Sequence, residues 1–386
     1  MRPPRTVLEQ KIRDRRQTLE EFAESAERFA REHGEAGTLG VRHLQRLVSG
    51  HGPKGRPLGP VRPATARLLE HMLGSSIDEL LAPAPVTAEP VDEGTVELRQ
   101  RLHASLQVDD AALTLLRDQL SSVRRLDRQL GAVIAHEEVC VKTSQVSALL
   151  DHSLPGRTRE QLASLLSELQ TLAGWQALDL GKTVQSWQHY EQAKRAARES
   201  GIEPFEIHTT AEQAFVLLDI GETRAAVDVL AATRRRAQAK SPKLLRAWLA
   251  AAHGEALAAD DQRDESLRAF DAAFQSLPTD PYLEDGPYVA LDNIHLARWR
   301  GHGLARIADP AAIGILTSAL QDLHPTFTRA EVALRVDLAT AYASADDRDA
   351  SQEEASKASF RARSIGSIRQ QRRIEGMLRG DCPGFG

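Results

Sequence analysis

The stretch Gly254–Pro278, GEALAADDQRDESLRAFDAAFQSLP, contains the pattern that best defines the fold of the larger part of this chain. Its small residues Gly254, Ser266 and Ala273 would allow two helices to approach closely, and Pro278 would end the second helix. Leu257 and Phe270 complete a set of six characteristic spacings. The stretch therefore predicts a pair of closely packed helices.

Weaker copies of this pattern lie on both sides of the stretch. Their residues are Ala214, Leu217, Gly221 and Ala226, then Gly301, Leu304, Ala312 and Ala319, then Ala339, Tyr342, Ser351 and Ala358, with an earlier copy at Trp175–Gly181, Tyr190 and Ala193. The small residues that open the second helix of each copy, Ala226, Ser266, Ala312 and Ser351, are separated by 40, 46 and 39 residues. These separations exceed the roughly 34 residues of a tetratricopeptide repeat, so we predict a degenerate array of such repeats with lengthened helices or loops.

Stacked helix pairs of this kind wind into a superhelix whose concave wall is made by the first helix of each pair. The predicted register places six residues on that wall, namely His208, Trp248, Glu255, His295, Arg298 and His302. The last three form one stripe at positions i, i+3 and i+7 of a helix. Two imidazoles and a guanidinium favour a carboxylate or a peptide C-terminus over an apolar ligand, and the imidazoles would gain charge as the pH falls. The alternative is that all of them are ordinary surface side chains.

The first 73 residues differ from the rest of the chain in charge. They carry 14 Lys and Arg against 9 Asp and Glu, although the whole chain has a net charge of −5. No acidic residue occurs between Glu35 and Glu70, a gap that contains six basic residues: Arg42, Arg46, Lys54, Arg56, Arg62 and Arg67. A local field of one sign is what a polyanion-binding surface needs.

Within this gap, residues 38–50 (TLGVRHLQRLVSG) predict a short helix that is capped by Thr38 and ended by Gly50. Val41, Leu44 and Val48 would face a core, which leaves a polar outer face of Arg42, His43, Gln45, Arg46 and Ser49. Arg and Gln match guanine and adenine edges in the major groove, so the segment is interpreted as a DNA recognition helix. In the following loop, Lys54 and Arg56 would contact the DNA backbone. The alternative is an ordinary solvated helix face.

Further helices are predicted around this segment. They cover Val7 to Arg16, Leu19 to His33 with a capping box from Thr18 and Glu21, Arg62 to Leu73, and a last turn at Ser76–Leu81. With residues 19–23, 41–50, 62–69 and 73–81, this unit resembles the Cro/repressor-type, Xre-like helix-turn-helix regulators, in the version fused to tetratricopeptide-like repeats that is abundant in GC-rich bacteria. The resemblance implies an all-α chain with a DNA-binding N-terminal domain and a helical-repeat sensor.

The expected organisation has four parts. Residues 1–82 form the helix-turn-helix domain, 83–93 a Pro-rich linker, 94–173 a helical connecting or dimerisation region, and 174–380 the repeat domain. In the connecting region, a long helix from Asp109 to Leu130 has apolar residues near heptad spacing, which suits either a dimer seam or packing within the chain. Three more helices are predicted there, at 94–106, 137–150 and 158–173.

Several classes of function are excluded or disfavoured by the sequence. No nucleophile elbow, zinc-protease motif or dinucleotide-binding turn occurs, so we expect neither an enzyme nor a cofactor. His136 and Cys140 are spaced to share a metal, but the sequence shows no third ligand and we predict no metal site. The chain has two cysteines and neither an apolar run that would span a bilayer nor a signal peptide, which together indicate a cytoplasmic protein.

The sequence thus favours a transcriptional regulator that binds double-stranded DNA. Its repeats would sense a peptide, a small molecule or a partner protein, and the protein would form a homodimer. The alternative is a tetratricopeptide-type interaction scaffold that does not bind DNA sequence-specifically.

Overall fold

The computed structural model describes residues 3–51, 58–84, 93–237, 241–280 and 286–379. Among these residues the regular secondary structure is helical, and Thr6 and Pro83 form an isolated β-bridge. The chain divides into two compact units, residues 1–96 and residues 97–386. We call them the head and the body. No helix in the described ranges is long and apolar enough to cross a membrane.

Five helices lie entirely within the described residues of the head. They are α1 (Val7–Asp14), α2 (Leu19–His33), α3 (Val41–Ser49), α4 (Pro63–Leu73) and α5 (Ile77–Leu81). Phe22, Leu44 and Leu68 are completely buried in their common core. The capping box of Thr18 and Glu21 at the start of α2 is present as predicted, and Gly50 ends α3 in the left-handed conformation.

The start of α3 differs from the prediction. Gly40, and not Thr38, is the N-cap residue, and it provides no side-chain hydrogen bond. The chain before it enters the core instead, because Leu39 is completely buried and Gly37 lies so close to α4 that an added Cβ would be 2.4 Å from the carbonyl oxygen of Ala64. A cap at Thr38 would have required the helix to begin where the chain is packing against α4.

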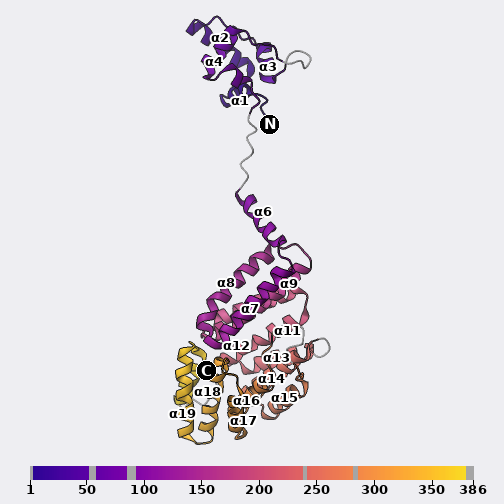
Figure 1. The fold of residues 1–386 in the computed structure, drawn as a ribbon, viewed down its shortest axis with the longest axis vertical. Helices are drawn as coiled ribbons and strands as arrows, with labels where there is room; N and C mark the ends of the chain where they lie inside the picture. The colour runs from indigo at the N-terminus through magenta and orange to yellow at the C-terminus, as the bar shows by residue number, and fades with distance from the viewer. Residues whose placement is uncertain (1–2, 52–57, 85–92, 238–240, 281–285, 380–386) are drawn as a thin grey trace. The chain divides into compact units, whose positions relative to one another are not determined.

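Most helices of the body pack side by side (Figure 1), and the first of them begins at Glu93, within the residues of the head. The helices of the body are α6 (Glu93–Leu106), α7 (Asp110–Leu130), α8 (Ala132–Asp151), α9 (Arg157–Asp179), α10 (Thr183–Ser200), α11 (Glu203–Glu212), α12 (Ala214–Asp219), α13 (Thr223–Ala237), α14 (Lys243–Ala259), α15 (Arg263–Ser276), α16 (Asn293–Arg306), α17 (Ala311–Asp322), α18 (Thr328–Ser344), α19 (Arg348–Ser364) and α20 (Ile368–Arg379). α9 is longer than the predicted 158–173 helix and continues through the point where a change of region was expected.

The same hydrogen bond recurs in three helix pairs of the body. Ser186 donates to the carbonyl of Gly174 at 2.7 Å, Ser266 to that of Gly254 at 2.8 Å, and Ser351 to that of Ala339 at 2.9 Å. In each case the serine opens the second helix and lies twelve residues after its acceptor. This repetition confirms that the pairs α9/α10, α14/α15 and α18/α19 are copies of one helical hairpin.

The heptad-spaced residues of α7 are used within the chain. Leu113 and Leu120 are buried in a cluster that includes Val146 and Leu162 from α8 and α9. Val123 packs in a second cluster with Val139. The structure therefore places most of the predicted seam in intrachain packing.

The last helix of the body returns to the first ones. Ser367 donates to Asp179 of α9 at 2.6 Å, and Arg369 of α20 pairs with Asp219 at 2.8 Å. Gly131 has φ +82°, and an added Cβ there would be 2.4 Å from the carbonyl oxygen of Ile365, so the contact at this point admits only glycine. The array of hairpins is thus closed on itself, with α7, α9, α18 and α20 meeting around its interior.

Candidate functional site

A partly open cavity of about 270 Å³ lies among the helices of the body. All six residues predicted for the concave wall line it: His208 from α11, Trp248 and Glu255 from α14, and His295, Arg298 and His302 from α16. The remaining wall comes from α7, α9, α18 and α20, among other elements. The cavity is therefore lined by more helices than the predicted groove, because the helices that close the array add their own side chains to it.

One part of the lining is aromatic. The rings of Phe215 and Trp299 lie with their centroids 6.2 Å and 6.0 Å from that of Trp248, in edge-to-face arrangements. The Trp175 ring lies 6.2 Å from Phe215 in the same manner, and the His208 ring lies 4.9 Å from Trp248. Such a cluster offers a rigid apolar surface to part of a ligand.

The charged part of the lining is centred on His302. Its Nδ1 lies 2.7 Å from Oδ1 of Asp337, and its Nε2 lies 3.4 Å from Oε1 of Glu255. Arg373 of α20 also donates to Asp337, at 2.6 Å. Burial alone would lower the pKa of His302, but the two carboxylates outweigh it and raise that pKa. The pKa values of Asp337 and Glu255 are lowered against the effect of their burial, chiefly by the charge of His302.

The histidines of the predicted stripe, and His208, lie close to carboxylates. The imidazole of His302 has a raised pKa and two carboxylate partners, and His295 Nδ1 lies 2.8 Å from Asp292. His208 similarly lies 3.5 Å from Glu212. These three imidazoles therefore already have carboxylate partners within the chain, whereas the prediction had assumed that they would face a ligand without such partners.

Arg298 is different. Its Nε is buried without a hydrogen-bond partner, and no carboxylate in the described part of the chain lies within ion-pair distance of its guanidinium. Its guanidinium carbon lies 6.0 Å from the centroid of the Trp299 ring. Burial lowers the pKa of Arg298, although Asp337 and Glu255 oppose that effect from a distance. A buried polar atom without a hydrogen bond costs free energy, so the Nε of this cation favours the binding of an anionic group here.

Sequence reasoning missed the contribution of the closing helices. Asp337, Arg369 and Arg373 line the cavity, as do Trp175 and Phe215. Arg369 and Arg373 are one helical turn apart, so the sequence could have shown that α20 has a basic stripe. The spacing could not show that this stripe faces the cavity.

The α3 surface of the head contains the residues predicted to bind DNA. Arg42, Gln45 and Arg46 are exposed, while His43 and Ser49 are half-buried. The Ser49 hydroxyl donates to the carbonyl of Arg46 at 2.9 Å, so this hydroxyl already has a hydrogen-bond partner at the end of α3. Partial burial, followed by the charges of Arg46 and Arg62, lowers the pKa of His43.

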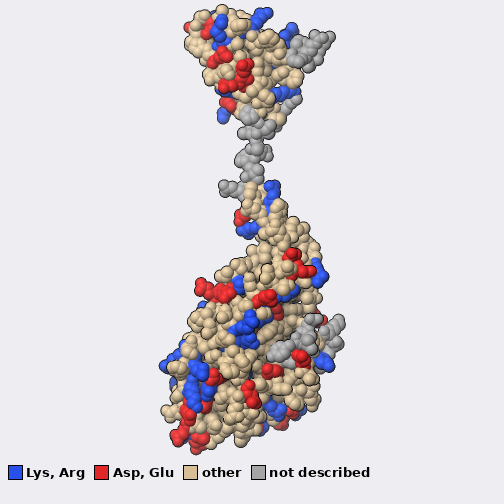
Figure 2. All heavy atoms as spheres, in the orientation of Figure 1, with Lys and Arg blue, Asp and Glu red and all other residues tan. Residues whose placement is uncertain are grey.

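Two further predicted contacts, Lys54 and Arg56, lie outside the described residues, as does most of the predicted Pro-rich linker. On the face of the body shown in Figure 2, basic and acidic side chains are interspersed. This mixed pattern does not resemble the acid-free stretch that was noted in the head sequence.

No protein-family model and no curated protein matches this sequence. Among solved structures, a crystal structure of the P58(IPK) TPR domain matches with 12% identity, over 93% of this chain and 99% of that one, at a TM-score of 0.25. Because this TM-score is low, the match does not assign the fold. The helical-repeat architecture is inferred from the recurring hairpins of the body itself.

Proposed function

We propose that this chain is a cytoplasmic, DNA-binding transcriptional regulator whose body responds to an anionic ligand in its cavity. The observation that carries the ligand part is Arg298, which lines the cavity, has no carboxylate partner among the described residues, and has a buried Nε without a hydrogen bond. The role is one of binding, without a catalytic step.

The cavity lining suggests the class of ligand. A carboxylate would form a charge-assisted pair with Arg298, and an apolar portion of the same ligand would lie against Trp248 and Trp299. A short peptide with a free C-terminus, or a small aromatic or branched carboxylic acid, has both features. The volume of about 270 Å³ favours a small molecule or the last residues of a peptide over a folded protein segment.

The DNA part of the proposal is supported by the head. Arg42, Gln45 and Arg46 are exposed on one face of α3, and the opposite face is buried in the head core. Side chains of these types are the ones that read base edges in the major groove. The acid-free stretch around them would favour the approach of a polyanion.

A homodimer would link the two activities. On α7, Leu115, Leu126 and Leu130 remain 64%, 38% and 46% exposed, and a second copy of the chain is proposed to cover them. Ligand binding would then change the dimer geometry and with it the spacing of two heads on adjacent half-sites.

The proposal is tested with the full-length protein and a random-sequence DNA library. We expect selection of a preferred sequence, with an affinity that falls steeply as the salt concentration rises, because several phosphate contacts release counterions. A protein that selects no sequence, or that fails to bind DNA at low salt, would contradict it.

Failure to bind DNA at low salt would favour the alternative function, a helical-repeat scaffold for another protein. The exposed apolar side chains of α7, together with Val133 and Ile134 of α8 at 53% and 60% exposure, are the observation on which it rests. Mass spectrometry of material that co-purifies with the protein separates the two, since the regulator should retain a small acid or peptide and the scaffold a protein.

A further inference from the structure

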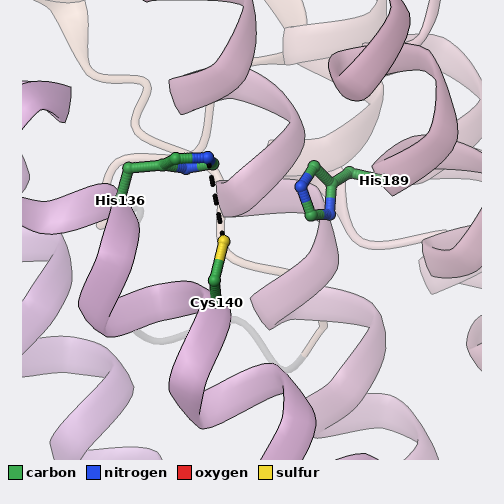
Figure 3. A group of neighbouring side chains, drawn as sticks. All are labelled: His136, Cys140 and His189. Atoms are coloured by element: carbon green, nitrogen blue, oxygen red, sulfur yellow. Dashed lines mark hydrogen bonds between the residues drawn. The ribbon is translucent and has the colours of Figure 1, made fainter.

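A cluster of three metal-ligating side chains lies in the body (Figure 3). His136 and Cys140 come from consecutive turns of α8, and His189 reaches them from α10. One ligand atom from each of the three lies within 4.8 Å of the others, and Nε2 of His136 is 3.7 Å from the Cys140 sulfur. The sequence suggested only the pair on α8, so His189 is the third ligand whose absence had argued against a site.

Both imidazoles are oriented by amide side chains. Gln176 donates to Asp127 at 2.9 Å, which directs its carbonyl oxygen toward Nδ1 of His136 at 3.4 Å. Because an amide oxygen only accepts, His136 carries its proton on Nδ1 and leaves Nε2 with a free lone pair.

The second imidazole is held in the same way. Gln170 donates to Gln192 at 2.6 Å and accepts from Nδ1 of His189 at 2.7 Å. His189 therefore also keeps Nε2 unprotonated. Supporting groups of this kind, bonded to the nitrogen that does not bind metal, are characteristic of histidine ligands in metal sites.

We propose that His136, Cys140 and His189 bind one Zn²⁺ ion through two Nε2 atoms and a thiolate, with a water molecule in the fourth position. Zn²⁺ accepts mixed imidazole and thiolate ligands in a tetrahedral arrangement. With bonds of about 2.0 to 2.3 Å, two such ligand atoms lie on the order of 3.5 Å apart. The 3.7 Å between His136 and Cys140 already fits, and a small movement of His189 completes the set.

The surroundings are compatible with a bound cation. Burial lowers the pKa of His136, and it lowers the pKa of His189 to about 4. Burial raises the pKa of the Cys140 thiol, opposed by nearby Lys182, and metal binding would displace the thiol proton to solvent. The three side chains are half-buried, which leaves a path for the ion.

The outer shell of this site reaches the ligand cavity. Asp127, which accepts from Gln176, also accepts from Arg329, and both residues line the cavity. The zinc proposal itself does not rest on the proposed regulatory function.

The test uses full-length protein stripped with a chelator and titrated with Zn²⁺ against a chromophoric competitor. We expect one ion per chain and at least a hundredfold weaker binding by His189→Gln and Cys140→Ser. Gln170→Ala should weaken binding by about 10- to 100-fold, since it removes only the support of a ligand. The control is His324→Gln, the same change at an exposed histidine, which should bind as the wild type does.

Two further measurements guard against misfolded variants. His189→Cys supplies another zinc ligand and should restore binding that His189→Gln loses. With Co²⁺ in place of Zn²⁺, a thiolate-to-metal charge-transfer band should appear in the wild type and be absent from Cys140→Ser. Equal binding by the wild type and the ligand variants, or a cobalt spectrum without that band, would overturn the proposal.

Discussion

The α3 surface of the head and the cavity of the body both contain basic side chains, but they hold them in opposite ways. Arg42 and Arg46 are exposed, so water screens their charges. In the cavity, His302 and Arg373 share the carboxylate of Asp337, which is only 2% exposed. The exposed charges therefore cost little to maintain, whereas the buried ones depend on their partners.

This difference makes the exception informative. An exposed arginine without a partner carries no information, because many surface charges have none. Arg298 is half-buried, but its Nε is buried and has no hydrogen-bond partner among the described residues, at a site where its neighbours have carboxylates. Burial thus turns the same observation, a cation without an anion, into an argument for a ligand.

The largest expected effect is at the buried carboxylate. Asp337→Asn removes the anion shared by His302 and Arg373 and should lower the free energy of unfolding of the body by about 3 to 5 kcal/mol. Urea unfolding followed by tryptophan fluorescence measures it, since all four tryptophans lie in the body.

The matched control is Asp346→Asn, at a side chain that is 89% exposed and pairs with an equally exposed arginine. It should cause no measurable loss of stability. Similar losses at both positions would erase the distinction between buried and exposed charges.

Arg298→Gln should separate binding from stability. Loss of its charge-assisted pair is expected to cost about 1.5 to 3 kcal/mol of ligand affinity, roughly a 10- to 150-fold rise in Kd. Calorimetry with short peptides that have free C-termini, compared with the same peptides amidated, measures it. The stability of the unliganded body should not fall, because no buried partner is orphaned.

Arg300→Gln on the same helix is the control, since Arg300 pairs at 2.7 Å with a half-exposed Asp271 outside the cavity. Its ligand affinity should equal that of the wild type. If Arg298→Gln binds peptide normally, or destabilises the body as Asp337→Asn does, the cavity assignment fails.

On the head, Arg46→Ala should cost about 1 to 3 kcal/mol of affinity for the selected DNA sequence and leave binding to unrelated DNA nearly unchanged. Fluorescence anisotropy on both DNAs at one salt concentration measures it. Arg31→Ala, at an exposed position of α2, provides the control. An equal loss on both DNAs would make Arg46 a phosphate contact.

The smallest effects concern pH, and their signs are opposite in the two regions. His302 has a raised pKa, so its stabilisation of the body is present below the unfolded pKa of about 6.5 and is lost as the pH rises through the folded value. His43 has a lowered pKa, so the head is destabilised as the pH falls below about 6.5. Histidine ring resonances in NMR should titrate above the ordinary value for His302 and below it for His43.

His302→Gln should remove the alkaline loss of stability from the body, as followed by tryptophan fluorescence. A body whose stability is unchanged as the pH rises above 6.5, with His302 present, would contradict the ion cluster around this residue.

Much of the local structure could be predicted from the sequence. Apolar spacing and capping residues located the helices of the head, and the small residues of the repeats located the hairpins of the body, because these features depend on neighbours within a few turns. The prediction at Thr38 was wrong because Leu39, the next residue, is drawn into the core.

The same reasoning placed His208, Trp248, Glu255, His295, Arg298 and His302 on one wall, and the structure brings them to one cavity. It did not show which of them are already paired. Asp337 lies 35 residues after His302 along the chain, and no spacing rule connects the two.

The tertiary structure alone decided how the array closes. Asp179 and Ser367 are 188 residues apart and share a hydrogen bond, and His189 joins His136 and Cys140 from another helix. Periodicity indicates that a helix face is buried, but not which distant element covers it. The helices and their pairing were therefore determined by short-range sequence, whereas the cavity, its unpartnered arginine and the three-ligand cluster came from long-range packing.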